Sequence, residues 1–347
     1  MKTHHSELGT LIDPNKFTGP LNTAGWAATH LRSMLNAMLT IRLVEETVAE
    51  LALSGEAKCP CHLAIGQEAV AVGVAQKLKT TDRAFGAHRS HSHFLAMGGS
   101  IQGLLSEVLG KATGCSLGMG GSMHLYGQEF GFMGSVPIVA GTVPLAVGAG
   151  LAAKMDGKGD IGIAFFGDGA AEEGVLHESL NLASQYEIPV LFVCENNLYS
   201  SHLDIAQRQP SDSVARFADA HHVPAKVVDG NDVLSVAVAT EELVAPLRAG
   251  KGPAFLEAVT YRWRGHVGPD ENVDVGVRRR AEDIVAWKQR DPVARLLSGM
   301  TSTDLDLSLA DVEQPIKDQV LDALAIARRA PYPPEEQNLS AVFKETS

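Results

Sequence analysis

Two apolar runs joined by one helical stretch constrain this chain most. The runs are residues 161–166 and 189–194; Asp168 comes just after the first, and Asn197 comes just after the second. Residues 171–185 between them carry apolar side chains at helical spacing, so the unit is predicted to be strand, helix, strand. A right-handed crossover makes the strands parallel, and ligands bind at the carboxyl edge of such sheets. Asp168 and Asn197 are therefore expected to face one pocket.

The residue types at this edge favour a metal ion bound to a phosphate. A carboxylate and an amide are hard oxygen ligands of the kind that Mg²⁺ prefers. Gly167 and Gly169 bracket Asp168, so backbone N–H groups can approach phosphate oxygens at the start of the next helix. The alternative is structural: Asp168 caps the helix from Ala170 onward, and Asn197 lies in a turn.

Further sequence blocks surround this pair in a fixed order. They are residues 62–69, 88–91, 120–124, 138–141, 228–232 and 261–266. Together with Gly-Asp-Gly and Asn-Asn, they resemble the alpha subunit of the thiamine diphosphate-dependent decarboxylase component of 2-oxo acid dehydrogenase complexes (pyruvate, branched-chain and acetoin types). A lone Gly-Asp-Gly would be weak evidence for this family. The ordered set of blocks, over roughly residues 30–295, is a specific signal.

The resemblance implies an α/β thiamine diphosphate-binding fold with a mostly parallel central sheet and helices on both faces, which agrees with the alternation of expected strands and helices. We expect an N-terminal arm over residues 1–25, a single domain over 26–330 and a C-terminal tail over 331–347. A glycine-rich segment, residues 114–137, is expected to be a long functional loop. Apolar periodicity predicts helices at residues 31–53, 67–78, 102–109, 142–154, 233–249, 281–297 and 309–329, and strands at 224–228 and 253–261.

The resemblance also implies roles for individual residues. The Mg²⁺ ligands would be Asp168, the Asn197 side chain and the Tyr199 backbone carbonyl. Residues expected at the cofactor are His88, Arg89, Ile138, Val139, Gly167, Gly169, Ala170, Asn197 and His266. The candidate catalytic residues are His62, His266 and His91, because an imidazole can move protons near neutral pH. Arg89 suits a phosphate, since a guanidinium forks onto its oxygens.

The chain departs from the family pattern at several positions. His88 stands where the family has a tyrosine, Ala140 replaces a glycine, and Val267 replaces the serine that follows the last histidine. Valine cannot be phosphorylated, so a phosphoserine switch is absent at that position. By composition alone, His88, His91 and His93 could also form a zinc site, but structural zinc usually has four tightly spaced ligands.

One part of the family's chemistry is missing from the chain. The glutamate that activates the thiamine pyrimidine ring comes from a beta subunit in this family. We therefore expect the chain to be inactive alone and to work in an α2β2 heterotetramer, with a lipoyl acyltransferase as a further partner and a small 2-oxo acid or acyloin as substrate. The small residues of 145–153 are expected to lie at an oligomer interface.

Three other functions compete with this interpretation. Residues 148–153 spell the GxGxxG/A fingerprint of nicotinamide enzymes, although Pro144 interrupts the strand that should precede it. A second possibility is an acetoin dehydrogenase, or an acyloin or transketolase-like thiamine enzyme working without lipoamide. The sequence hardly distinguishes it from an enzyme that transfers an acyl group to lipoamide. A degenerate scaffold subunit is disfavoured by the intact Asp168, Asn197, Arg89 and His266.

Bulk properties exclude other classes. The net charge of −12 argues against nucleic acid or an anionic membrane as the main partner. No apolar run reaches the length of a membrane span, and the N-terminal residues lack the apolar core of a secretion signal. The four cysteines are then expected to be reduced thiols in the cytoplasm.

Overall fold

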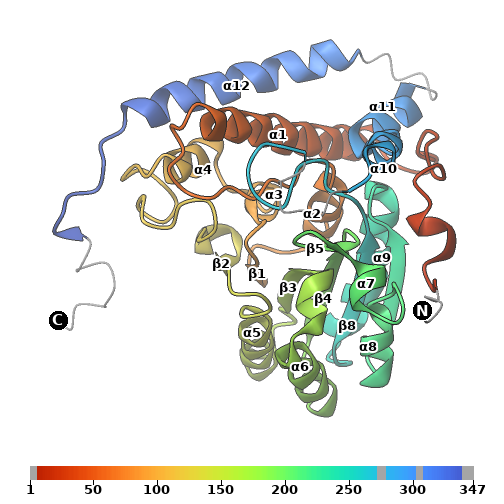
Figure 1. Cartoon of the computed structure of the whole chain (residues 1–347). Coiled ribbons are helices and arrows are strands. Elements are labelled where there is room, and N and C mark those ends of the chain that lie inside the picture. The colour runs from red at the N-terminus through yellow and green to blue at the C-terminus, as the bar shows by residue number, and fades with distance from the viewer. Residues whose placement is uncertain (1–5, 272–278, 302–307, 338–347) are drawn as a thin grey trace.

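A six-stranded parallel sheet forms the centre of the molecule. The computed structural model describes residues 6–271, 279–301 and 308–337 (Figure 1). The sheet order is β2-β1-β3-β4-β8-β7, and every neighbouring pair is parallel. Its strands are β1 (Arg83–Gly86), β2 (Phe132–Ser135), β3 (Gly162–Gly167), β4 (Val190–Asn196), β7 (Ala225–Asp229) and β8 (Ala254–Val259). The predicted parallel α/β fold is confirmed.

The central strands β3 and β4 are buried on both faces. Ile163, Phe165 and Val193 pack into one apolar core, whereas Phe166 and Phe192 pack into another. Successive side chains of a strand point to opposite faces, so the two cores lie on opposite sides of the sheet. Strands covered on both faces need continuous apolar runs, and these two runs are the ones that made the unit predictable.

Helices cover both faces, as predicted (Figure 1). The first core contains side chains from α1 (Ala28–Leu53), α2 (Glu68–Ala75), α3 (His91–Ala96), α4 (Ile101–Val108), α9 (Val233–Arg248), α11 (Pro292–Thr301) and α12 (Leu309–Arg329). The second contains side chains from α5 (Val143–Asp156), α6 (Gly174–Gln185), α7 (Ile205–Arg208), α8 (Ala215–Ala220) and α10 (Ala281–Lys288). None of the described helices is long and apolar enough to cross a membrane.

Several elements differ from the sequence-based expectation. The single helix expected over residues 281–297 is two helices, because Pro292 starts α11 and cannot continue α10. The glycine-rich segment contains the 3₁₀ turn η2 (Gln128–Phe130) and the edge strand β2. A two-stranded antiparallel sheet, β5 (Tyr199–Ser200) with β6 (Leu203–Asp204), follows β4 directly.

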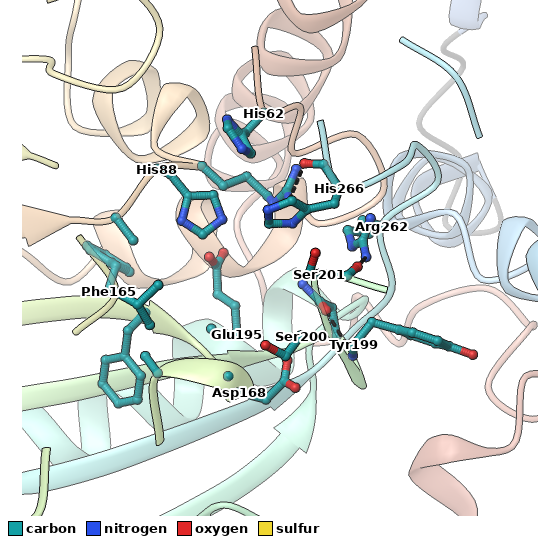
Figure 2. Close-up of a pocket in the computed structure, with 18 of the residues that line it drawn as sticks. His62, His88, Phe165, Asp168, Glu195, Tyr199, Ser200, Ser201, Arg262 and His266 are labelled. Atoms are coloured by element: carbon teal, nitrogen blue, oxygen red, sulfur yellow. Dashed lines mark hydrogen bonds between the residues drawn. The ribbon is translucent and has the colours of Figure 1, made fainter. Parts of the chain in front are cut away.

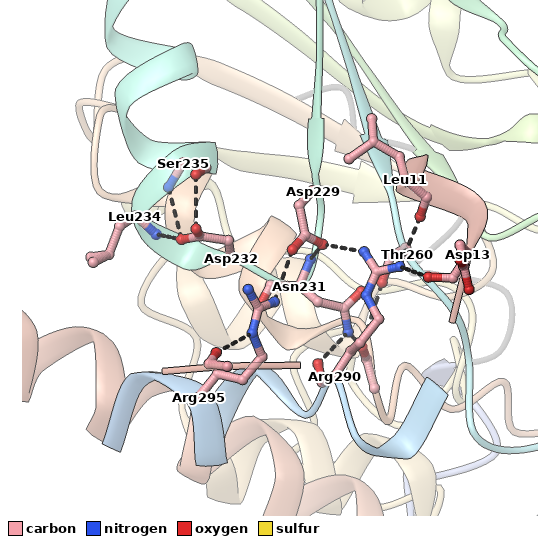
Figure 3. Close-up of polar contacts among 12 residues, drawn as sticks. Leu11, Asp13, Asp229, Asn231, Asp232, Leu234, Ser235, Thr260, Arg290 and Arg295 are labelled. Atoms are coloured by element: carbon pink, nitrogen blue, oxygen red, sulfur yellow. Dashed lines mark hydrogen bonds and ion pairs between the residues drawn. The ribbon is translucent and has the colours of Figure 1, made fainter. Parts of the chain in front are cut away.

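The N-terminal arm is held against the fold rather than loose. The Asp212 carboxylate accepts hydrogen bonds from the Ser6 hydroxyl and the Glu7 and Leu8 N–H groups. Farther on, the Arg290 guanidinium donates to the Leu11 carbonyl at 2.8 Å (Figure 3).

A buried ion network anchors Arg290 in turn. The Asp229 carboxylate at the end of β7 contacts Arg290 at 2.7 Å and Arg295 at 2.8 Å (Figure 3). Asn231 donates to the Arg290 and Gly66 carbonyls, and Asp232, not Asn231, caps α9. The network joins the arm, β7 and the α10–α11 corner.

Candidate active site

One cavity opens where β1, β3, β4 and β8 end at the carboxyl edge of the sheet. Its volume is about 250 Å³. Asp168 and Asn197 both line it, because β3 and β4 are paired in register up to Gly167 and Glu195. The lining residues also include His62, Gln67, His88, Arg89, Val139, Gly169, Ala170, Tyr199, Ser200, Ser201, Arg262 and His266 (Figure 2). The carboxylate and the amide thus share one pocket, as expected.

Asp168 is a buried carboxylate with one free oxygen. Its side chain is 2% exposed, and Oδ1 has no hydrogen-bond partner among the described residues. Oδ2 accepts from the guanidinium of Arg208, which also contacts Glu172. Burial raises the Asp168 pKa, and the Arg208 charge opposes that rise. A positive charge next to Asp168 is therefore needed to stabilise its ionised form, because an isolated buried carboxylate is strongly unfavourable.

Asn197 is fixed by its neighbours. Its Nδ2 donates to Gln67 Oε1 at 3.3 Å, and its Oδ1 accepts from the Tyr199 N–H at 3.2 Å. The structural alternative is therefore half right: Asn197 does close a turn. Asp168, in contrast, caps neither the 3₁₀ turn η3 (Asp168–Glu172) nor α6.

The loop after β3 approaches the β5–β6 hairpin so closely that only glycine fits. A Cβ added to Gly169 would lie 2.4 Å from Ser200 Oγ and 2.8 Å from Ser200 Cβ. The residues present fit a divalent cation and a diphosphate: a free carboxylate oxygen, an amide oxygen with a spare lone pair, and a glycine-bracketed loop. Arg208 supplies the positive charge in this structure.

Three histidine rings meet on the opposite wall of the cavity. The ring centroids of His62, His88 and His266 are 4.7, 5.0 and 5.3 Å apart. Burial, followed by the charge of Arg89, lowers the pKa to about 3 for His62, about 2 for His88 and about 3 for His266. These imidazoles are neutral at pH 7, so each ring can donate one hydrogen bond and accept another.

Two buried arginines give the cavity a positive wall. Arg89 donates to the Leu63 carbonyl at 2.6 Å and the His266 carbonyl at 3.0 Å, and burial lowers its pKa to about 10. Arg262 contacts the Ser201 carbonyl, and burial together with Arg89 lowers its pKa to about 8. Arg262 lies within the family block of residues 261–266, but no role was expected for it. Its place just past β8 was the available signal.

Two residues expected at the site lie outside the cavity lining. His91 is fully buried; its Nδ1 is 2.8 Å from Glu45 Oε2, and its Nε2 is 2.8 Å from Ser122 Oγ. Both ring nitrogens thus have hydrogen-bond partners within the protein, which suits a residue that supports the cavity wall from behind. Ile138 is 70% exposed, although its neighbour Val139 lines the cavity. The catalytic role of His91 and the cofactor contact of Ile138 stay predictions.

Two alternative interpretations do not match the geometry. The composition-based zinc group of His88, His91 and His93 is not assembled: His88 joins His62 and His266, while His93 stacks on Phe165. The GxGxxG/A fingerprint at residues 148–153 lies inside α5, with no strand-to-helix turn before it. A nicotinamide site needs that turn.

Comparison with known proteins identifies related chains. A family model described as dehydrogenase E1 component matches residues 36–336. The alpha subunit of acetoin:2,6-dichlorophenolindophenol oxidoreductase from Bacillus subtilis is 36% identical over 310 residues, covering 89% of this chain and 92% of that protein. Alpha subunits of the pyruvate dehydrogenase E1 component from Rhizobium meliloti (85% of each chain) and Zymomonas mobilis (97% of this chain and 95% of the relative) are each 35% identical.

Proposed function

Because this chain belongs to the dehydrogenase E1 component family, we propose that it is the alpha subunit of a thiamine diphosphate-dependent 2-oxo acid dehydrogenase. The reaction would be decarboxylation of a 2-oxo acid followed by acyl transfer to lipoamide. The observation that carries the proposal is the shared cavity of Asp168 and Asn197 at the carboxyl ends of β3 and β4.

The oxygen-rich edge of the cavity would hold the cofactor's diphosphate. Asp168, the Asn197 side chain and the Tyr199 carbonyl would bind Mg²⁺, and the Gly169 and Ala170 N–H groups would donate to phosphate oxygens. When bound, thiamine diphosphate supplies the electron sink for decarboxylation. The free Asp168 Oδ1 supports this arrangement, since a cation would satisfy it.

The opposite wall would serve the substrate. Arg262 presents a cation that suits the carboxylate of a 2-oxo acid. His62 and His266 would act there as neutral imidazoles that hydrogen-bond and orient the reacting groups. His88, Arg89 and His266 stay expected contacts of the cofactor, since a guanidinium forks onto phosphate oxygens. Val139 would cover the cofactor from the side of α5.

An acetoin dehydrogenase is the second candidate. It is supported by the Bacillus subtilis relative, whose name specifies acetoin and a dye acceptor. Assaying the assembled enzyme with 2-oxo acids plus lipoamide, and with acetoin plus 2,6-dichlorophenolindophenol, separates the two. Turnover of acetoin alone would replace the first proposal.

The partner of the chain would be a beta subunit, in an α2β2 assembly that transfers the acyl group to a lipoyl acyltransferase. Exposed apolar side chains at and just before the start of α5 support an interface beside the cavity: Ile138 (70% exposed), Val139 (45%) and Leu145 (53%). The single domain over residues 26–330, the inactivity of the chain alone and the cytoplasmic location stay predictions.

Replacing the proposed metal ligand tests the assignment. Asp168→Ala should weaken Mg²⁺-dependent binding of thiamine diphosphate by at least about a hundredfold, since changing groups that only support metal ligands already costs about 10–100-fold. Calorimetry on the assembled enzyme measures this. The exposed Glu178 on α6 offers a matched control, Glu178→Ala, which should bind normally. Equal affinity in both variants would remove Asp168 from the site.

A further inference from the structure

We propose that His62, His88 and His266, here called the histidine cluster, form a binding site for a transition-metal cation of the Zn²⁺ class. The site is distinct from the Mg²⁺ position proposed at Asp168. Each histidine comes from a different segment: His62 precedes α2, His88 follows β1, and His266 follows β8. Figure 2 shows the three rings gathered on the side of the cavity away from Asp168.

The geometry of the histidine cluster is close to that of a three-histidine metal site. One ring nitrogen from each residue lies within 4.8 Å of the other two. Zn–N bonds of about 2.0–2.1 Å in a tetrahedron place the nitrogens about 3.3 Å apart. Closing the difference needs small ring rotations, which His88 and His266 can make because they are only partly buried. Three histidines with an open fourth position form a known zinc pattern.

His62 has a ring nitrogen available for a metal, which binds through the lone pair of an imidazole. His62 Nδ1 is buried and makes no well-aligned hydrogen bond among the described residues, so its lone pair has no geometric competitor.

Charged side chains of both signs face the histidine cluster, among them two arginines and one glutamate. Arg89 and Arg262 oppose a cation, since their charges act on all three rings. Glu195 opposes the arginines: its buried Oε1 makes no well-aligned hydrogen bond, and its carboxylate points toward the cluster in Figure 2. Both arginines also donate hydrogen bonds to backbone carbonyls. We expect reversible binding rather than a permanently loaded metal.

His88 is the third ligand of the site, and a neutral phenol at its position would be a poor ligand for Zn²⁺ compared with imidazole. A bound cation would use the lone pairs of His62 and His266, so it would block any proton transfer through them. The metal site itself does not depend on the proposed function, because it needs no thiamine diphosphate.

Direct metal titration tests the inference. The full chain, freed of metal by a chelator, is titrated with Zn²⁺ by calorimetry in excess Mg²⁺, and with Co²⁺ by visible absorption. We expect one site and the intense absorption of tetrahedral Co²⁺. His88→Tyr should weaken Zn²⁺ binding at least about tenfold and abolish that absorption, given the usual cost of disturbing metal sites.

Two further variants keep the test decisive. His266→Asn removes a different ligand and should have the same effect, with circular dichroism checking that both variants fold. His177 and His221 form a separate pair with ring centroids 5.7 Å apart, so His177→Ala is the control and should bind normally. Unchanged Zn²⁺ affinity in His88→Tyr and His266→Asn, or a loss confined to His177→Ala, would overturn the site.

Discussion

Arg208 is the positively charged partner of Asp168 in this structure. Its side chain is 6% exposed and contacts both Asp168 and Glu172. Mg²⁺ and Arg208 would compete for the same carboxylate, because Oδ2 is taken by the guanidinium while Oδ1 stays free.

Removing this arginine should make stability depend on the metal. Arg208→Gln leaves the buried Asp168 charge without its partner, so the free energy of unfolding should fall by about 3 kcal/mol without Mg²⁺. With Mg²⁺ and thiamine diphosphate, the loss should be much smaller. Denaturant unfolding under both conditions measures the difference.

The control for this variant is an exposed pair of the same chemistry. Arg280 contacts Asp283 on the surface, and its side chain is 77% exposed. Arg280→Gln should leave the unfolding free energy nearly unchanged, because exposed ion pairs contribute little to stability. If Arg208→Gln lost the same free energy with and without the ligands, Arg208 would be a structural residue and not the metal's competitor.

Among the elements, β3, α6 and β4 could be predicted because their own residues show the apolar pattern of a buried strand or of an amphipathic helix. Ile163 and Phe192 lie in runs buried on both faces, and Leu176 and Leu180 lie at helical spacing. Their pairing then places Asp168 beside Asn197 without further information.

Other elements depend on packing that no local pattern records. The strands β1 and β2 have four residues each, and β5 and β6 have two each, too few for a period to be visible. The positions of Arg208, Glu195 and Arg262 follow from these short elements and from the loop after β8. The sequence therefore predicted that Asp168 and Asn197 share one edge of the sheet, but not the charges around them.

The contact between the β3 loop and the β5–β6 hairpin should be sensitive to one methyl group. In Gly169→Ala, the new Cβ would overlap Ser200 and push the hairpin that carries Tyr199. We expect binding of thiamine diphosphate with Mg²⁺ to weaken at least about tenfold, since displaced ligands lose affinity on this scale. Calorimetry on the assembled enzyme checks it.

Two companion variants identify the cause. Nothing lies within 4 Å of a Cβ at Gly174, so Gly174→Ala should bind the cofactor normally and stabilise α6 by up to about 1 kcal/mol. Ser200→Gly in the Gly169→Ala background should restore binding, because it removes the overlapping atoms. A failure of this rescue would mean that the hairpin is not what the methyl group displaces.

At the scale of the whole molecule, the cavity is bordered by an uncovered apolar surface. Leu145 on α5 is 53% exposed, and Val139 links this surface to the cavity. Scattered apolar residues are ordinary, but a patch beside a binding cavity marks an interaction site. A beta subunit seated there would complete the cavity with groups that this chain lacks.

A charge on this surface should therefore prevent assembly without unfolding the chain. Leu145→Asp should weaken association with the beta subunit at least about tenfold, because a buried unpaired charge costs several kcal/mol. Val285 on α10 is 61% exposed and lies away from α5, so Val285→Asp is the control. Sedimentation of the mixed subunits measures both, and equal assembly would place the interface elsewhere.

The tie between the arm and Asp229 has a consequence for how the protein tolerates trimming. Arg290 is fully buried and satisfies its guanidinium through the Leu11 carbonyl as well as Asp229. Any protease cut that detached the first dozen or so residues would remove the Leu11 acceptor and leave Asp229 as the charged partner of Arg290 in the α10–α11 corner. The opening stretch of the polypeptide thus fastens the α10–α11 corner to the carboxyl end of β7, and a shortened protein would lose rigidity there first.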